Sequence, residues 1–135
     1  MEKIVKILGI IILIYTFVFY PIPLYNSFVD LFRGFNVFRV PTFWNNVILF
    51  PLLLFLGYGL YKVRNIARVI MIWCSAFALL INVPGIQALV QGSVPYKFSD
   101  LPLGYWIERG GLLIIALASL IILNLPPVKI LFKNK

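Results

Sequence analysis

The chain alternates long apolar stretches with short charged segments. Four stretches carry no charged residue at all, namely 7–29, 40–61, 69–96 and 110–128, and they are 23, 22, 28 and 19 residues long. A membrane-spanning helix needs about 20 mostly apolar residues to cross a hydrocarbon core of about 30 Å. The pattern therefore predicts an all-α fold, an integral membrane bundle of four transmembrane helices.

Prolines set the expected ends of the spans within these four stretches, because a proline lacks a backbone N–H and clashes with the preceding helical turn. We expect Pro21 and Pro23 to end the first span. Pro84-Gly85 is expected to break or kink the third before a further turn at Ile86–Val90, and Pro126-Pro127 to stop the fourth. The expected spans are about 4–20, 46–61, 67–83 and 110–125, with outer loops at 21–45 and 84–109 and a hairpin at 62–66.

The first outer loop has the periodicity of a short amphipathic helix. Asn26, Asp30 and Arg33 recur at helical spacing, and large apolar residues fill the positions between them up to Pro41. This pattern is typical of a helix that lies in the membrane interface, and an irregular loop along the membrane surface is the alternative. The second outer loop mixes prolines with aromatic residues, so we expect it to lie on the membrane surface as well.

Composition indicates one membrane domain over residues 1–135. The chain is 62% hydrophobic and 12% charged, whereas soluble domains are about 25% charged. The net charge of +8 does not indicate nucleic acid, because the basic residues cluster at the ends of apolar runs, where anionic lipid headgroups attract them. Membrane lipids are the expected partners, and no nucleic acid is expected.

The basic residues also predict an orientation, because cytoplasmic segments carry an excess of Lys and Arg. With the N-terminus inside, the inner segments hold eight basic residues and the outer segments four. We therefore expect a multi-pass protein of the cell membrane with both termini and the hairpin 62–66 in the cytoplasm. Lys62, Arg64 and Arg68 are its densest basic group. We expect them to anchor this topology and contact anionic lipid, with docking of a cytoplasmic partner as the alternative.

No predicted span carries a charge deep in its interior. A charged side chain at the bilayer centre costs at least about 2.5–3.5 kcal/mol and usually marks an ion pathway. The pattern therefore argues against a self-contained ion-coupled transporter. Uncharged polar residues do occur in or near the spans, and we expect hydrogen bonds between helices from them rather than a polar path. They are Thr16, Ser75, Asn82, Gln87, Ser119 and Asn124.

The residues that carry chemistry are few. There is no histidine and one cysteine, Cys74, so neither a disulfide within the chain nor a usual transition-metal site is expected. Asp100, Glu108 and Arg109 form a candidate polar cluster in the second outer loop. Two carboxylates can act as acid and base or bind a cation, but salt bridges with Lys97 and Arg109 are the expected role. We expect no catalytic, cofactor or metal site.

Small residues mark faces on which helices can approach closely. Gly57 and Gly59 form a thin stripe on the second span. The fourth span is expected to pack its small residues against those of the third: Gly111, Ala116, Ala118 and Ser119 against Cys74, Ser75, Ala76 and Ala78.

Two short segments carry a shared pattern. They are Gly57-Tyr58-Gly59-Leu60-Tyr61 with Asn65-Ile66-Ala67-Arg68, and the tail Leu125–Phe132. They resemble the G-x-G-L-aromatic, A-R and P-x-V-K-x-x-F pattern of an uncharacterised family of small bacterial four-helix inner-membrane proteins. Here Asn65 stands where an aromatic residue is frequent, and an Ile-Leu pair replaces the usual polar pair before Phe132. The resemblance implies a bacterial inner-membrane location and supplies no activity.

The leading hypothesis is a non-enzymatic accessory or interaction protein of the cytoplasmic membrane. It would bind a membrane-protein partner through its small-residue helix faces or its outer loops. The alternative is a small transporter or channel subunit that forms a path as a homo-oligomer.

Overall fold

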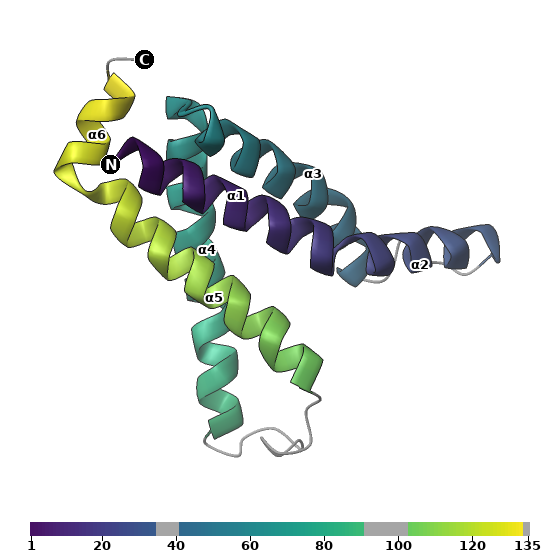
Figure 1. The fold of residues 1–135 in the computed structure, drawn as a ribbon. Helices are drawn as coiled ribbons and strands as arrows, with labels where there is room; N and C mark the ends of the chain where they lie inside the picture. Colours follow the sequence, from purple (N-terminus) through teal and green to yellow (C-terminus); the bar gives the residue numbers. More distant parts are fainter. Residues whose placement is uncertain (35–40, 91–102, 134–135) are drawn as a thin grey trace.

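The computed structural model of the chain describes residues 1–34, 41–90 and 103–133, and these form helices with no strand among them. The predicted all-α fold is confirmed. The helices follow one another along the chain (Figure 1). They are α1 (Glu2–Phe19), α2 (Pro21–Phe32), α3 (Pro41–Tyr61), α4 (Asn65–Val90), α5 (Leu103–Asn124) and α6 (Pro126–Lys133).

Three helical segments are long and apolar enough to cross a membrane. They are Glu2–Phe32, which joins α1 to α2, Asn65–Asn82 in α4 and Trp106–Asn124 in α5. A shorter apolar segment, Asn46–Tyr61, occupies the position of the remaining expected span. The three long segments give the chain the length and hydropathy of a transmembrane protein.

Pro21 and Pro84 were expected to interrupt helices. Pro21 lies at the start of a helix, and Pro84 lies within one. Tyr20 keeps a right-handed helical backbone after α1, and Pro21 then begins α2. Proline is well tolerated in the first turn of a helix, because the N–H it lacks has no intrahelical acceptor there. α4 continues through Pro84 to Val90. α1 therefore ends before Pro21, as expected for the first span, but the chain continues as a further helix from Pro21 onward.

The segments expected as outer loops contain more helix than their composition suggested. The amphipathic segment expected from Asn26 onward is observed as α2, which begins at Pro21 and ends at Phe32. α2 has no buried residue and extends away from the other helices (Figure 1). Residues 35–40 of the first outer loop and 91–102 of the second lie outside the described residues.

α1 and α3 cross at two glycines, where their backbones come close together. A Cβ atom added to Gly9 would lie 2.6 Å from the carbonyl oxygen of Gly57 and 2.7 Å from the amide nitrogen of Tyr61. Neither atom can move away by a side-chain rotation, so the two backbones meet only because both residues lack a side chain. Gly59 faces the Cβ of Ala67 on α4 in the same way. The prediction that Gly57 and Gly59 permit close approach is confirmed.

The α3–α4 connection is a Schellman turn, and Val63 lies at its left-handed position. The amide of Arg64 donates to the carbonyl of Gly59 over 2.8 Å, and the amide of Val63 donates to that of Leu60 over 2.9 Å. Glycine usually takes this position, because a left-handed backbone crowds a Cβ atom. Val63 has a φ of 57° and is 2% exposed. Burial of its side chain therefore offsets the backbone strain.

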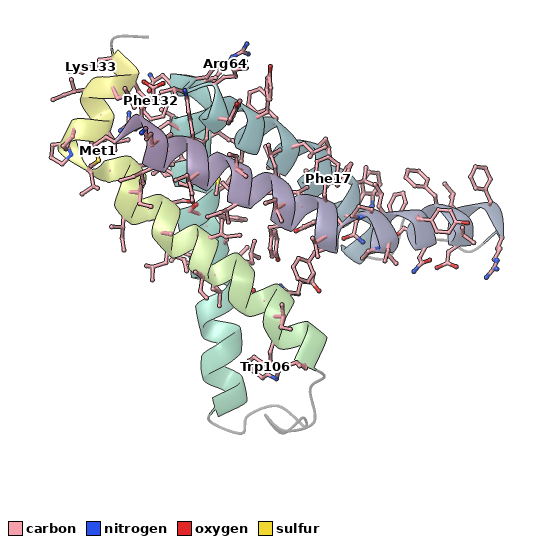
Figure 2. The ribbon with its side chains drawn as sticks, in the orientation of Figure 1. Met1, Phe17, Arg64, Trp106, Phe132 and Lys133 are labelled. Carbon is pink, nitrogen blue, oxygen red and sulfur yellow. The ribbon has the colours of Figure 1, made fainter. Side chains whose placement is uncertain are left out.

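The two chain ends and the α3–α4 hairpin lie at the same end of the bundle (Figure 1), which we call the closed end. α6 packs there against α1 and α5, with Val128 and Phe132 buried. Figure 2 shows Met1, Phe132 and Lys133 near Arg64, and Trp106 at the opposite end. The α1–α3 and α4–α5 pairs lie close together at the closed end and diverge away from it (Figure 1).

Candidate functional site

The divergence of the two helix pairs leaves a cavity of about 360 Å³ between α1, α3, α4 and α5. Ligand sites in proteins have volumes of about 300–1,000 Å³ and often lie between the helices of a bundle. The volume is therefore that of a small ligand site, and the cavity is the candidate functional site of this protein.

Aliphatic side chains make up the inner wall of the cavity. Ile12 comes from α1, Leu53 from α3, Met71 from α4, and Ile115 and Ala116 from α5. Each of these side chains is at most 9% exposed. Their positions follow from the helical repeat, which directs one stripe of each helix to the interior. The inner wall therefore offers dispersion contacts to an apolar group.

Polar groups line the cavity where the helices diverge. The guanidinium of Arg109 on α5 donates to the side-chain oxygen of Asn82 on α4 over 3.1 Å. The hydroxyl of Tyr15 on α1 donates to the backbone carbonyl of Glu108 on α5 over 2.7 Å. The ring of Tyr20 meets that of Tyr15 edge to face, with centroids 6.4 Å apart. These bonds tie the first turns of α5 to α1 and to α4, and we call this region the polar end of the cavity.

Ser75 lines the cavity about two helical turns from Asn82, and its hydroxyl has no partner. Its Oγ is the one buried side-chain nitrogen or oxygen in the described part of the chain that makes no hydrogen bond. Leaving such a group unpaired costs about 1–3 kcal/mol. Ser119 and Thr16, which are also buried, each donate to the carbonyl four residues earlier, over 2.6 and 2.7 Å. Ser75 is therefore a buried polar group without a hydrogen-bond partner in the wall of a mostly apolar site.

Most of the polar residues of the spans bond within their own helices. Asn82 donates to Ala78 and Asn124 to Leu120, as Ser119 and Thr16 donate to the preceding turn. We had expected these side chains to bond between helices, and in the described residues only the Asn82–Arg109 pair does so. A carbonyl one turn away is always within reach in a helix, whereas an acceptor on a neighbouring helix requires a specific crossing. The side chain of Gln87 lies outside the described residues.

The predicted outer polar cluster is only partly described. Glu108 and Arg109 both lie near the start of α5 and are exposed, and Asp100 lies outside the described residues. Glu108 contributes its backbone carbonyl to the polar end, and Arg109 contributes its guanidinium. Sequence reasoning named Arg109 for a surface cluster and did not connect it with Ser75 or Asn82, because only the crossing of α4 and α5 brings them to one cavity.

The three residues of the predicted basic group differ in their surroundings. Arg68 makes contacts inside the bundle, and Lys62 and Arg64 are exposed. Nε of Arg68 donates to the carbonyl of Leu123 near the end of α5 over 3.0 Å, and its guanidinium carbon lies 5.6 Å from the ring centroid of Phe132. Arg68 therefore joins three helices at the closed end. Lys62 lies 5.8 Å from the centroids of two neighbouring tyrosine rings on its own helix end. Arg64 is exposed and points away from the bundle (Figure 2).

The lining of the cavity is mainly aliphatic and aromatic. Ser75, Asn82, Arg109 and the thiol of Cys74 are also part of it. Within residues 1–34, 41–90 and 103–133, no three His, Cys, Asp or Glu side chains lie close enough to hold a metal ion.

Comparison with known proteins gives no assignment for this site. No protein family, curated protein or solved structure matches the chain.

Proposed function

We propose that this protein is a multi-pass protein of the cell membrane that acts as a non-enzymatic accessory or interaction protein. In this proposal it crosses the membrane four times, with α1, α3, α4 and α5 as the spans. α3 has 21 residues, which at 1.5 Å per residue is about 32 Å and matches a hydrocarbon core of about 30 Å. The length of α3 therefore supports the fourth span.

The charge distribution of the fold supports an orientation with both termini in the cytoplasm. Basic residues of the first helix, the hairpin and α6 belong to the closed end, where the chain ends and the hairpin lie together. An excess of Lys and Arg marks cytoplasmic segments. Reporter fusions at Asn65 and at Ser93 test this orientation. We expect cytoplasmic reporter activity at Asn65 and external activity at Ser93, and external activity at Asn65 would contradict the proposal.

The cavity is the observation that carries the proposed binding role. Its polar end is held by hydrogen bonds between helices, and its inner wall is apolar. A membrane helix bundle that encloses such a space can hold an apolar group from the bilayer or a side chain from a partner helix. The described lining presents donors and apolar surface, which are the means of binding rather than of transformation.

The test is to fill the cavity and measure what still associates with the protein. Ala116→Leu adds volume to the cavity wall, and Leu117→Phe adds volume to the neighbouring exposed position of α5, where Leu117 is 53% exposed. After mild solubilisation, native mass spectrometry identifies bound lipids and proteins. We expect Ala116→Leu to remove the associated molecule and Leu117→Phe to keep it. Equal association in both variants would contradict the proposal, and solute flux in liposomes that only Ala116→Leu blocks would favour a transporter or channel subunit instead.

A further inference from the structure

We propose that the closed end binds anionic phospholipid headgroups through a surface that we call the basic face. This surface is made of Lys3 from α1, Lys62 and Arg64 from the α3–α4 hairpin, and Lys129 and Lys133 from α6, all of which are exposed. These residues lie in three separate segments of the sequence, and the fold brings the segments to one end of the bundle (Figure 1). The inference rests on the membrane location proposed above and names the ligand class.

The protein does not neutralise the charge of the basic face. Among the described residues, Glu2 is the one acidic residue at the closed end, and its carboxylate pairs with Lys6 over 2.8 Å. The other described acidic residues, Asp30 and Glu108, belong to α2 and to the start of α5. The closed end therefore presents an excess of positive charge, which attracts anions within a Debye length of about 8–10 Å.

The surroundings of the basic face favour a lipid over an acidic segment of a soluble protein. Large apolar or aromatic side chains next to its cations are 40–60% exposed, namely Ile4, Tyr61, Ile66 and Ile130. The ammonium of Lys62 lies 5.8 Å from the ring centroids of Tyr58 and Tyr61. Tyrosine and lysine are typical of the membrane boundary, where the ring stays at the apolar layer and the cation reaches the phosphates. A phospholipid covers both kinds of group, whereas an acidic soluble segment would cover only the charge.

α6 contributes two cations that the sequence indicated only for the orientation. Its Val128 and Phe132 are buried against the bundle, and Lys129 and Lys133 follow them at the same spacing of four residues on an exposed face. Arg68, in contrast, donates to a carbonyl of α5 and lies over the ring of Phe132. Arg68 therefore belongs to the packing of the closed end, and the α6 lysines take the place expected for it at the lipid.

The experiment is a lipid competition on the purified full chain in detergent, read by native mass spectrometry. Phosphatidylglycerol and phosphatidylcholine with the same acyl chains are added at equal concentration. A single basic residue near an anionic surface changes affinity by about fivefold. Because several cations share the basic face, we expect phosphatidylglycerol to be retained over phosphatidylcholine by about tenfold or more.

The basic face is tested by removing charge from α6. Lys129→Gln/Lys133→Gln should lower the ratio of the two retained lipids by about fivefold or more. Lys129→Arg/Lys133→Arg should keep the ratio, because the charge is retained. The control is Arg33→Gln/Arg39→Gln, which removes the same charge from the first expected outer loop. It should leave the ratio unchanged, because Arg33 follows α2, which extends away from the closed end (Figure 1).

Two results would overturn the lipid assignment. One is equal retention of the two lipids by the unmodified chain. The other is an equal loss of phosphatidylglycerol from the α6 variant and from the control. An acidic protein that leaves the α6 variant while the lipid ratio stays the same would likewise overturn it, in favour of a protein partner.

The failure of the lipid assignment is distinguishable from the failure of the membrane role. Extraction of the chain from membranes by alkaline carbonate would contradict the membrane role itself. A chain that resists extraction and retains both lipids equally would contradict only the lipid assignment.

Discussion

The crossing of α1 and α3 makes a sharp prediction for Gly9→Ala. The new methyl group would begin 2.6 Å from the Gly57 carbonyl oxygen and 2.7 Å from the Tyr61 amide nitrogen. Ordinary contact begins at 3.4 Å, so the helices must separate locally by about 0.8 Å. A gap of about 0.5–1 Å forfeits a quarter to a half of the dispersion energy of each affected atom pair.

The size of the effect follows from two opposing terms. Overfilling a packed contact costs about 1–3 kcal/mol, and the crossing is flanked by the fully buried Val5 and Leu56, whose contacts would loosen. Replacing a helical glycine by alanine returns about 0.5–1 kcal/mol of backbone entropy. We therefore expect Gly9→Ala to destabilise the bundle by a net amount of about 1–2 kcal/mol.

Gly110→Ala is the matched control, because a Cβ atom at Gly110 has no neighbour within 4 Å. It receives the same entropic gain without the clash and should be neutral or stabilising. Both free energies of unfolding are measured in the same detergent by reversible denaturation with tryptophan fluorescence. If Gly9→Ala were as stable as Gly110→Ala, the close crossing would be refuted. Gly57→Ala should fall between them, since its nearest contact is the Leu13 side chain at 2.8 Å, which can rotate.

Three further predictions concern the closed end. Gly59→Ala should destabilise by about 1–3 kcal/mol by meeting the Ala67 methyl group, and Ala67→Gly should recover much of that loss in the double variant. Arg68→Gln should cost about 1 kcal/mol and increase protease cleavage of the tail, because the Leu123 carbonyl loses a charged donor that is partly exposed to solvent. Val63→Gly should be at least as stable as Val63→Ala in the same unfolding assay, because only glycine relieves a left-handed strain of about 1–2 kcal/mol.

Each of these three predictions has a result that would contradict it. Additive effects of the Gly59 and Ala67 substitutions would show that the two residues do not touch. Arg64→Gln is the control for Arg68, because Arg64 is exposed, and equal tail cleavage in both variants would remove the internal role of Arg68. A Val63→Gly variant less stable than Val63→Ala would mean that the turn is not left-handed at this position.

The helices and the close contacts could be predicted because they depend on local properties. A long run of apolar residues has few alternatives to a helix in a membrane, where every backbone group must be paired internally. Gly57 and Gly59 permit close approach whatever helix arrives, since the absence of a side chain is a property of the residue. Gly9 is the one glycine of the first predicted span, 4–20, and also indicated a place of close approach. This contact was not predicted.

The sequence was less informative where a residue permits two structures. α1 and α5 end before Pro21 and Pro126, as expected, but each proline also begins a further helix, α2 and α6. Proline fits either role, and packing decides between them. In α6 the buried Val128 and Phe132 are four residues apart, which is a helical spacing that the sequence displayed.

The cavity could not be predicted, because it depends on the angle between helix pairs rather than on any one helix. Ser75 was expected among small packing residues, and nothing in its neighbours along the chain distinguishes it from Ser119. The difference arises from the tertiary structure. Ser119 donates to the Ile115 carbonyl, whereas the Ser75 hydroxyl is buried without a partner.

The difference between the two ends of the bundle explains why a cavity exists in so small a protein. At the closed end, the Gly9 crossing and the Arg68 contact with Leu123 hold the helices at close range. The α1–α3 and α4–α5 pairs diverge from this end (Figure 1), and side chains do not fill the gap between them. Tyr15 and Arg109 bridge that gap with hydrogen bonds from α1 to α5 and from α5 to α4. They connect the helices at the polar end without filling the space, so the cavity lies between the tight end and these two bonds.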